Sequence, residues 1–243
     1  MFMKKFKKVF AFVAIMMGMS TMAIAQDGFS VRAGGNFPVG TFAQGDAVDN
    51  ALLNATSELG AAATGFNAGV KCQFSVVGNL GLFATADFFY NELNEETQDA
   101  LKVKNDDVTL PTYMNVPIML GANYKVLDFA SVALWAEAGA GLNFRNISAN
   151  TISAAVGTLV SGSTETVYDL SYSFAWQAGI GVTLAETLSL GVHYYGFGAA
   201  DVKGESTASA NIGGLLDTES KPVAFTNGKL NPSMLVVRLG YTF

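Results

Sequence analysis

The sequence Ser233-Met-Leu-Val-Val-Arg-Leu-Gly-Tyr-Thr-Phe243 decides the fold, because every second residue in it is large and apolar. Leu235, Val237, Leu239, Tyr241 and Phe243 form one set, and Met234, Val236, Arg238, Gly240 and Thr242 form the other. Successive side chains of a β-strand point to opposite faces, so the stretch predicts a strand with one apolar face. The terminal aromatic ring suits a membrane interface better than it suits water.

Seven further runs upstream show the same alternation of apolar and polar residues. They are residues 28–38, 65–76, 80–91, 113–124, 129–144, 168–184 and 188–198. Short connections and long ones alternate strictly between the eight runs, as in transmembrane barrels with short periplasmic turns and long extracellular loops. Each run is long enough to cross a bilayer when tilted. We therefore predict an all-β fold, an eight-stranded antiparallel transmembrane up-and-down β-barrel.

The long connections carry few strand signals. They are residues 39–60, 91–112, 145–167 and 199–232, and we interpret them as loops, with a short helix at 51–59. The short connections are 77–79, 125–128 and 185–187. Pro117 lies inside the fourth run and removes one hydrogen-bond donor from the ladder, so we expect a bulge there.

The amino terminus has the pattern of a secretory signal. Lys4, Lys5, Lys7 and Lys8 precede an apolar core that is too short to span a membrane. The triplet Ala23-Ile24-Ala25 matches the small-x-small cleavage pattern, so we expect a cut between Ala25 and Gln26. The predicted organisation is a signal peptide at 1–25 and a barrel domain at 26–243.

Composition excludes several classes of function. Half of the chain is hydrophobic, yet no run beyond the amino terminus is long enough for a transmembrane helix. Removing the four lysines of the signal changes the formal charge from −6 to −10, which disfavours nucleic-acid binding. With one cysteine, Cys72, and one histidine, His193, the chain has no internal disulfide and no familiar zinc motif. We expect no cofactor and no metal.

The two faces of the predicted strands differ in kind. One is almost continuously aliphatic and aromatic, and we expect it to face lipid, with aromatic girdles near both interfaces. The other is rich in glycine and polar residues and suits the narrow interior of an eight-stranded barrel. Its charged residues are expected to form one hydrogen-bonded network. They are Arg32, Lys71, Asp87, Glu137, Asp169 and Arg238.

Two other interpretations of these faces remain open. A soluble sandwich or lipocalin-like barrel would turn the apolar faces inward, and the signal pattern and terminal Phe243 argue against it. The lumen charges could also line a gated ion path instead of a polar plug.

Two further hypotheses, an enzymatic function and a calcium site, have weaker support in the sequence. The sole candidate base, His193, shares a face with Ser189 and Tyr195, and that face points into the lumen and away from lipid. Acidic clusters at 92–96 and 106–107 could collect Ca²⁺ or bridge it to lipopolysaccharide phosphate, but their spacing matches no ordered calcium loop. We therefore expect a protein that is not an enzyme.

With the signal, the eight runs, the segment 113–120 and the terminal 239–243, the chain resembles small outer-membrane barrels of the OmpA/OmpX type. More narrowly, it resembles the porin-like outer-membrane β-barrel domain family. The resemblance implies a location in the bacterial outer membrane, with lipid and lipopolysaccharide as neighbours. It also implies insertion by the barrel assembly machinery, which would read Leu239, Tyr241 and Phe243.

The resemblance implies no single activity. Four long loops on a rigid scaffold favour a structural role or a surface interaction with an extracellular partner. The alternative is a narrow pore or transporter for small solutes, and a lipid-modifying enzyme is a third reading.

Overall fold

The computed structural model describes residues 28–45, 52, 57–104, 107–129, 131–156, 160–212 and 216–243. The expected signal peptide lies outside the described residues, as does most of the helix expected at 51–59. Among the described residues, no helix is long and apolar enough to cross a membrane.

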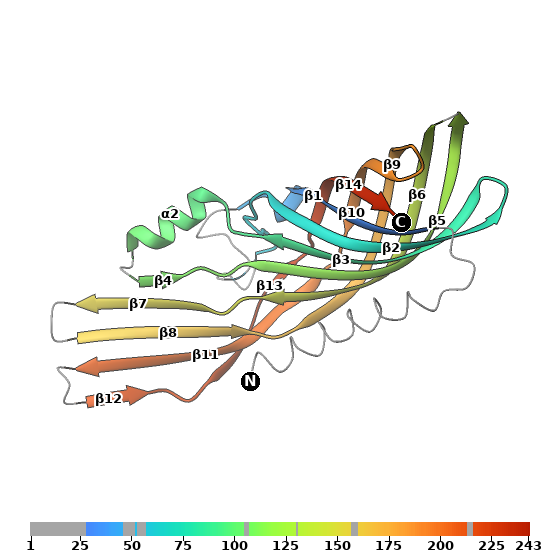
Figure 1. The fold of residues 1–243 in the computed structure, drawn as a ribbon. Coiled ribbons are helices and arrows are strands. Elements are labelled where there is room, and N and C mark those ends of the chain that lie inside the picture. The colour runs from blue at the N-terminus through green and yellow to red at the C-terminus, as the bar shows by residue number, and fades with distance from the viewer. Residues whose placement is uncertain are drawn as a thin grey trace.

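Eight strands close into an antiparallel barrel in the order β1-β14-β10-β9-β6-β5-β3-β2. Neighbours in the barrel are neighbours along the chain, apart from the strands inserted in the long connections, so the up-and-down prediction is confirmed (Figure 1). The barrel strands are β1 Gly28–Val39, β2 Gly65–Val77, β3 Leu80–Asn91, β5 Tyr113–Phe129, β6 Val132–Ile147, β9 Ser171–Leu184, β10 Leu188–Gly196 and β14 Ser233–Thr242.

The terminal strand β14 closes the barrel between β1 and β10. Its residue Leu239 pairs with Ala33 of β1 and with Leu190 of β10. Burial alternates along β14, with Met234, Val236 and Arg238 buried and the residues between them exposed. The alternation predicted from the sequence therefore separates lumen from exterior.

Glycine makes room for large side chains in the lumen. A Cβ atom on Gly121 would overlap the Phe83 ring, and one on Gly181 would overlap the Trp135 ring. An eight-stranded barrel has an interior that side chains can fill, so these two close approaches let the aromatic rings fit.

Pro117 does not produce the bulge that we expected. The pairing between β5 and β3 is interrupted beside it, but the same register resumes at Asn115, and the pairing with β6 stays regular. The bulge lies instead between Lys125 and Leu127, where β5 continues through the segment predicted as a turn. It leaves Phe129 exposed on the exterior while Asp128 lines the interior.

The long connections are not simple loops, because most of them fold into regular elements. The predicted loop at 145–167 contains β7 Asn150–Val156 and β8 Val160–Tyr168. The loop at 199–232 contains β11 Ala200–Ile212, β12 Leu216–Glu219 and β13 Val223–Leu230. With β4 Asp107–Thr109, these strands form a second sheet in the order β12-β11-β8-β7-β4, with β13 on β11. We call it the distal sheet, and Figure 1 shows it projecting beyond one end of the barrel.

The acidic connection between β3 and β5 also has regular structure. Residues Glu95–Lys104 form helix α2. The Asn94 side chain accepts a hydrogen bond from the Thr97 amide at 2.8 Å, as a helix N-cap does. Glu95 and Glu96 lie in the first turn, where the helix dipole favours negative charge. The acidic cluster is thus partly explained by a helix start, which corrects the expectation of a solvated loop.

The long connections also enclose an apolar cluster at their end of the barrel. Phe42 is the last residue of the short 3-10 helix η2 Gly40–Phe42 and packs edge-on against Tyr113, with ring centroids 5.1 Å apart. The Tyr113 hydroxyl donates to the carbonyl oxygen of Gly60 at 2.6 Å. These contacts tie the first long connection to the start of β5.

The sixth predicted strand is interrupted where we expected continuity. β8 ends at Tyr168, β9 begins at Ser171, and Asp169 lies exposed between them. Tyr168 is buried against Phe225 of β13, with ring centroids 5.9 Å apart, and does not belong to an outward girdle. The predicted lumen position of Asp169 is therefore wrong, since its amide bonds to the Lys203 carbonyl of β11.

Candidate functional site

The lumen of the barrel gathers five of the six charged residues predicted to form a network. Arg32 comes from β1, Lys71 from β2, Asp87 from β3, Glu137 from β6 and Arg238 from β14. All five are buried, and we call them the ionic layer. Asp169 lies outside this group. Strands far apart in the sequence thus contribute one charged residue each to a single level of the barrel.

Glu137 contacts four polar side chains in the lumen. Its Oε2 lies 2.5 Å from Nζ of Lys71, and its Oε1 lies 3.5 Å from a guanidinium nitrogen of Arg32. Oε1 also lies 3.0 Å from Nε2 of His193 and accepts from the Gln177 amide at 3.3 Å. Both carboxylate oxygens are therefore occupied, as burial of a charged group requires.

Asp87 bridges the two arginines. It accepts hydrogen bonds from Arg32 at 3.0 and 3.3 Å and from Nη1 of Arg238 at 3.2 Å. The Tyr195 hydroxyl donates to the same carboxylate at 3.3 Å. Since Arg32 contacts both Asp87 and Glu137, the two carboxylates belong to one connected network.

Three participants were not predicted as members of this network. They are Gln177, His193 and Tyr195, all buried. The sequence did indicate where they lie, because the alternation of apolar and polar residues puts them on the same lumen-facing side of the strands as the predicted charges. A search for polar lumen residues, including uncharged ones, would have found all three.

An aromatic layer closes the lumen above the ionic layer, on the side of the long connections. The rings of Phe89, Tyr195 and Phe197 have centroids 4.9 to 5.7 Å apart, and all three are fully buried. The Arg238 guanidinium lies 4.8 Å from the Tyr195 centroid and 5.2 Å from that of Phe89, within cation–π range. Met119 and Met234 are also buried. Side chains thus fill the middle of the barrel.

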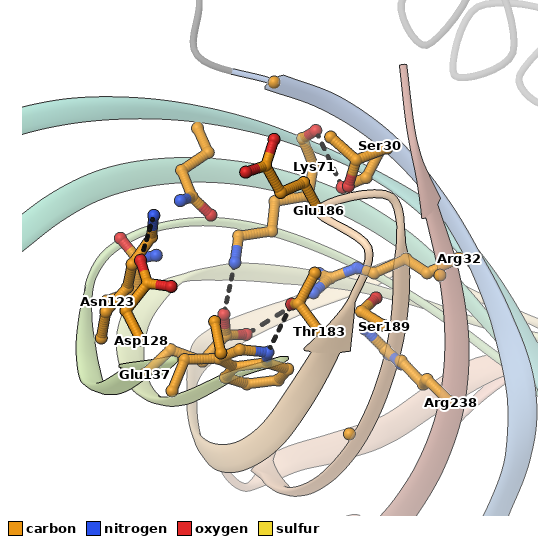
Figure 2. A pocket seen from close by; sticks show the side chains of 18 of the residues that line it. Ser30, Arg32, Lys71, Asn123, Asp128, Glu137, Thr183, Glu186, Ser189 and Arg238 are labelled. Atoms are coloured by element: carbon orange, nitrogen blue, oxygen red, sulfur yellow. Dashed lines mark hydrogen bonds and ion pairs between the residues drawn. The ribbon is translucent and has the colours of Figure 1, made fainter. Parts of the chain in front are cut away.

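A cavity of about 330 Å³ occupies the other end of the lumen. Its rim is formed by the short turns, with Lys125, Asp128, Ser131 and Glu186, and its inner end by residues of the ionic layer. Figure 2 shows Lys71 reaching Glu137 across this space, with Arg32, Ser189 and Arg238 at the right of the view. The lumen is therefore hollow toward the short turns and filled toward the long connections.

Arg145 is a buried cation outside the ionic layer, placed near the distal end of β6. Its guanidinium donates to the carbonyl oxygens of Leu230 at 3.0 Å and Gly198 at 3.1 Å. Among the described residues, no carboxylate lies within ion-pair distance of it. Arg145 instead ties the barrel wall to the connections that begin and end the 199–232 segment.

Replacing Arg145 with methionine is expected to loosen the 199–232 segment while the barrel stays closed. The buried Leu230 carbonyl would lose its donor, which costs about 1–3 kcal/mol, and the partly buried Gly198 carbonyl would lose one as well. Limited digestion in detergent with a glutamate-specific protease should cut this segment faster than in the parent protein, and Lys229→Met, at an exposed cation, should change nothing. Equal cleavage of parent and Arg145→Met would contradict this role.

The exterior of the barrel is apolar on every strand. Large side chains are exposed at alternate positions, and none of the eight barrel strands carries a charged residue on this outward face. Among the most exposed are Leu120, Phe129, Tyr172, Phe174, Ile180 and Leu239. A soluble protein rarely exposes so continuous an apolar surface, and a closed barrel leaves no backbone edge unpaired in lipid.

The barrel has the fold of a small outer-membrane protein. Its lumen is polar and its surface suits lipid, which is the reverse of a lipocalin-like barrel. The polar lumen and the apolar exterior therefore argue against the soluble, lipocalin-like alternative.

No protein-family model and no curated protein matches the chain. Solved structures resemble it at low identity. Neisserial surface protein A is 12% identical, with 88% of this chain and 97% of that chain covered at a TM-score of 0.42. OprG from Pseudomonas aeruginosa is 14% identical, with 89% of this chain and 95% of that chain covered at a TM-score of 0.42. Ail, the attachment invasion locus protein of Yersinia pestis, is 14% identical, with 91% of this chain and 100% of that chain covered at a TM-score of 0.40.

The terminal residues Leu239, Tyr241 and Phe243 lie on the exterior, as the alternation predicts. The Phe243 amide donates to the Phe29 carbonyl at 2.9 Å, and its ring lies 5.0 Å from that of Tyr241. These rings form an aromatic group beside the short turns, where an interfacial girdle would lie.

His193 and Ser189 do not form a nucleophile–base pair. They are four residues apart on β10, which separates their Cα atoms by about 13 Å along a strand. Nε2 of His193 contacts Glu137, and the centroid of the His193 ring lies 5.6 Å from that of the Trp135 ring. The arrangement is that of a packed histidine within the ionic layer.

Proposed function

We propose that this protein is a non-conducting, non-enzymatic barrel of the bacterial outer membrane that serves a structural or surface-interaction role. The observation that carries this proposal is the aromatic layer of Phe89, Tyr195 and Phe197, which fills the lumen above the ionic layer. A lumen filled in this way supports a scaffold better than a conduit. Its contacts with partners would then lie outside the barrel.

The route to the outer membrane rests on both ends of the chain. The basic and apolar pattern of residues 1–25 would direct secretion, with cleavage between Ala25 and Gln26. The aromatic strand with Leu239, Tyr241 and Phe243 would then be read by the barrel assembly machinery. This orientation puts the short turns in the periplasm and the long connections outside the cell.

The distal sheet and helix α2 are the surfaces that would meet an extracellular partner or lipopolysaccharide. They are built from the long connections and project beyond the barrel in Figure 1. Binding residues are often carried by connections that a rigid scaffold positions. The pairing of β8 with β11 over nine residue pairs makes this projection a sheet of some stiffness.

A narrow pore is the second candidate, and one observation favours it. The cavity of about 330 Å³ reaches from the short turns to the ionic layer, so one half of a path through the lumen is already open. In a pore, ions would pass the same lumen charges that form a polar plug in the scaffold proposal.

Conductance in planar lipid bilayers separates the two functions. We expect purified, folded protein to give no steady channels, because buried rings block the lumen. A general porin inserted into the same bilayers serves as the positive control. Steady, reproducible current steps from the folded protein would overturn the non-conducting proposal and favour the pore.

A further inference from the structure

The inner end of the lumen cavity presents more positive than negative charge. Arg32, Lys71 and Arg238 all line it, whereas Glu137 lines it and Asp87 does not. The ionic layer as a whole has three cations and two carboxylates. A buried excess of positive charge is unfavourable unless an anion balances it.

The one carboxylate at the inner end has little capacity left for further donors. Oε2 of Glu137 is taken by Lys71, and Oε1 is shared by Arg32, His193 and Gln177. Asp87 is likewise shared by the two arginines and by Tyr195. The excess charge therefore cannot be neutralised by rearranging bonds within the layer.

Several buried donors beside the cavity lack a partner among the described residues. They are Nε of Arg32 and Nε and Nη2 of Arg238. Arg238 is only 3% exposed, yet it lines the cavity, and aromatic rings cover it on the other side. Two arginine side chains that line the closed end of a cavity, each with donors that no acceptor in the described part of the chain takes, form an arrangement that an oxyanion stabilises.

We propose that this cavity binds one small oxyanion, a phosphate or carboxylate group, that enters from the short-turn end. Two arginines supply charge-assisted hydrogen bonds, and the low dielectric of the closed lumen strengthens them. Ser30, Thr183 and Ser189 offer hydroxyl groups along the wall toward the rim. A volume of about 330 Å³ lies at the lower end of the range for ligand pockets, so the ligand is small.

This site goes beyond the proposed scaffold function and does not depend on it. A cavity closed at its inner end can hold an anion whether or not the distal sheet meets a partner. If the barrel conducts, the same site would act as an anion-selective constriction instead.

Isothermal titration with inorganic phosphate tests the proposal on the folded protein in non-ionic detergent at fixed ionic strength. We expect saturable binding of one phosphate per barrel. Arg238→Gln should weaken it about tenfold or more, since it removes a charged donor. Lys203→Gln, at an exposed cation of β11, should leave the affinity unchanged.

A second variant keeps the test valid if Arg238→Gln fails to fold. Ala133→Trp narrows the rim of the cavity and leaves every residue of the ionic layer in place. Loss of phosphate binding in this variant supports a site inside the lumen. Absence of saturable binding in the parent protein, or binding that Ala133→Trp leaves unchanged, would overturn the proposal.

Discussion

Replacing Glu137 with alanine is expected to lower the free energy of unfolding in detergent micelles by about 3–5 kcal/mol. The carboxylate is fully buried and is shared by Lys71, Arg32 and His193. Its removal leaves Lys71 without its 2.5 Å partner at the inner end of the lumen cavity. Thermal unfolding followed by circular dichroism measures the change.

A double variant separates the loss of an ion pair from the loss of packing. Lys71→Met combined with Glu137→Leu removes both charges, and it should be more stable than Glu137→Ala alone, because no unpaired ammonium remains. Glu165→Ala, at an exposed carboxylate of β8, is the matched control and should leave the transition in place. An unchanged unfolding temperature in Glu137→Ala would refute the stabilising role of the ionic layer.

Replacing Gly141 with alanine is expected to destabilise the barrel by about 3 kcal/mol. Gly141 faces the lumen on β6, and a Cβ atom there would overlap the carbonyl oxygen of Ile118 on β5. Because the obstacle is the backbone of the neighbouring strand, no side-chain rotation can relieve it. Urea unfolding in detergent measures the loss.

Gly162→Ala is the matched control for Gly141→Ala. Gly162 lies on β8 of the distal sheet, where a Cβ atom would come no closer than 3.5 Å, to the Ser209 carbonyl oxygen. That distance is an ordinary contact, so the unfolding transition should not move. Equal stability of the two variants would show that the close approach of β5 and β6 does not limit packing.

The barrel strands were predictable because lipid and lumen impose opposite chemistries on successive residues. Along β14, for example, the exposed Leu239 and the buried Arg238 obey the period of two without exception. The lumen location of Arg32, Lys71, Asp87 and Glu137 follows from the same period. Closure followed from the even count of runs and the alternating lengths of the connections.

The distal sheet was missed because its strands lack that contrast. The segment Val160–Tyr168 reads VSGSTETVY, with small or polar residues at most positions. A strand that exposes both faces to water needs no apolar alternation, so its sequence resembles that of a loop. Only its pairing with β11, far along the chain, fixes it as a strand.

The error at Asp169 has a different cause. The alternation of β9 was extended back through Leu170 to Tyr168, although the strand begins at Ser171. Two residues of irregular backbone are enough to break the relation between a residue's place in the sequence and the face of the sheet to which its side chain points. Arg145 was missed because the fifth predicted run ended at residue 144, which placed Arg145 in a loop, whereas β6 continues to Ile147.

The position of the two tryptophans tests the orientation of the barrel wall most directly. Trp176 is exposed on the exterior, whereas Trp135 lies in the lumen and donates to the Thr183 hydroxyl at 3.1 Å. Trp135→Phe and Trp176→Phe each leave one tryptophan, whose fluorescence is measured in bilayers with brominated lipid chains. We predict strong quenching of Trp176 and little quenching of Trp135. Quenching of Trp135 with Trp176 unaffected would contradict a lipid-facing apolar exterior.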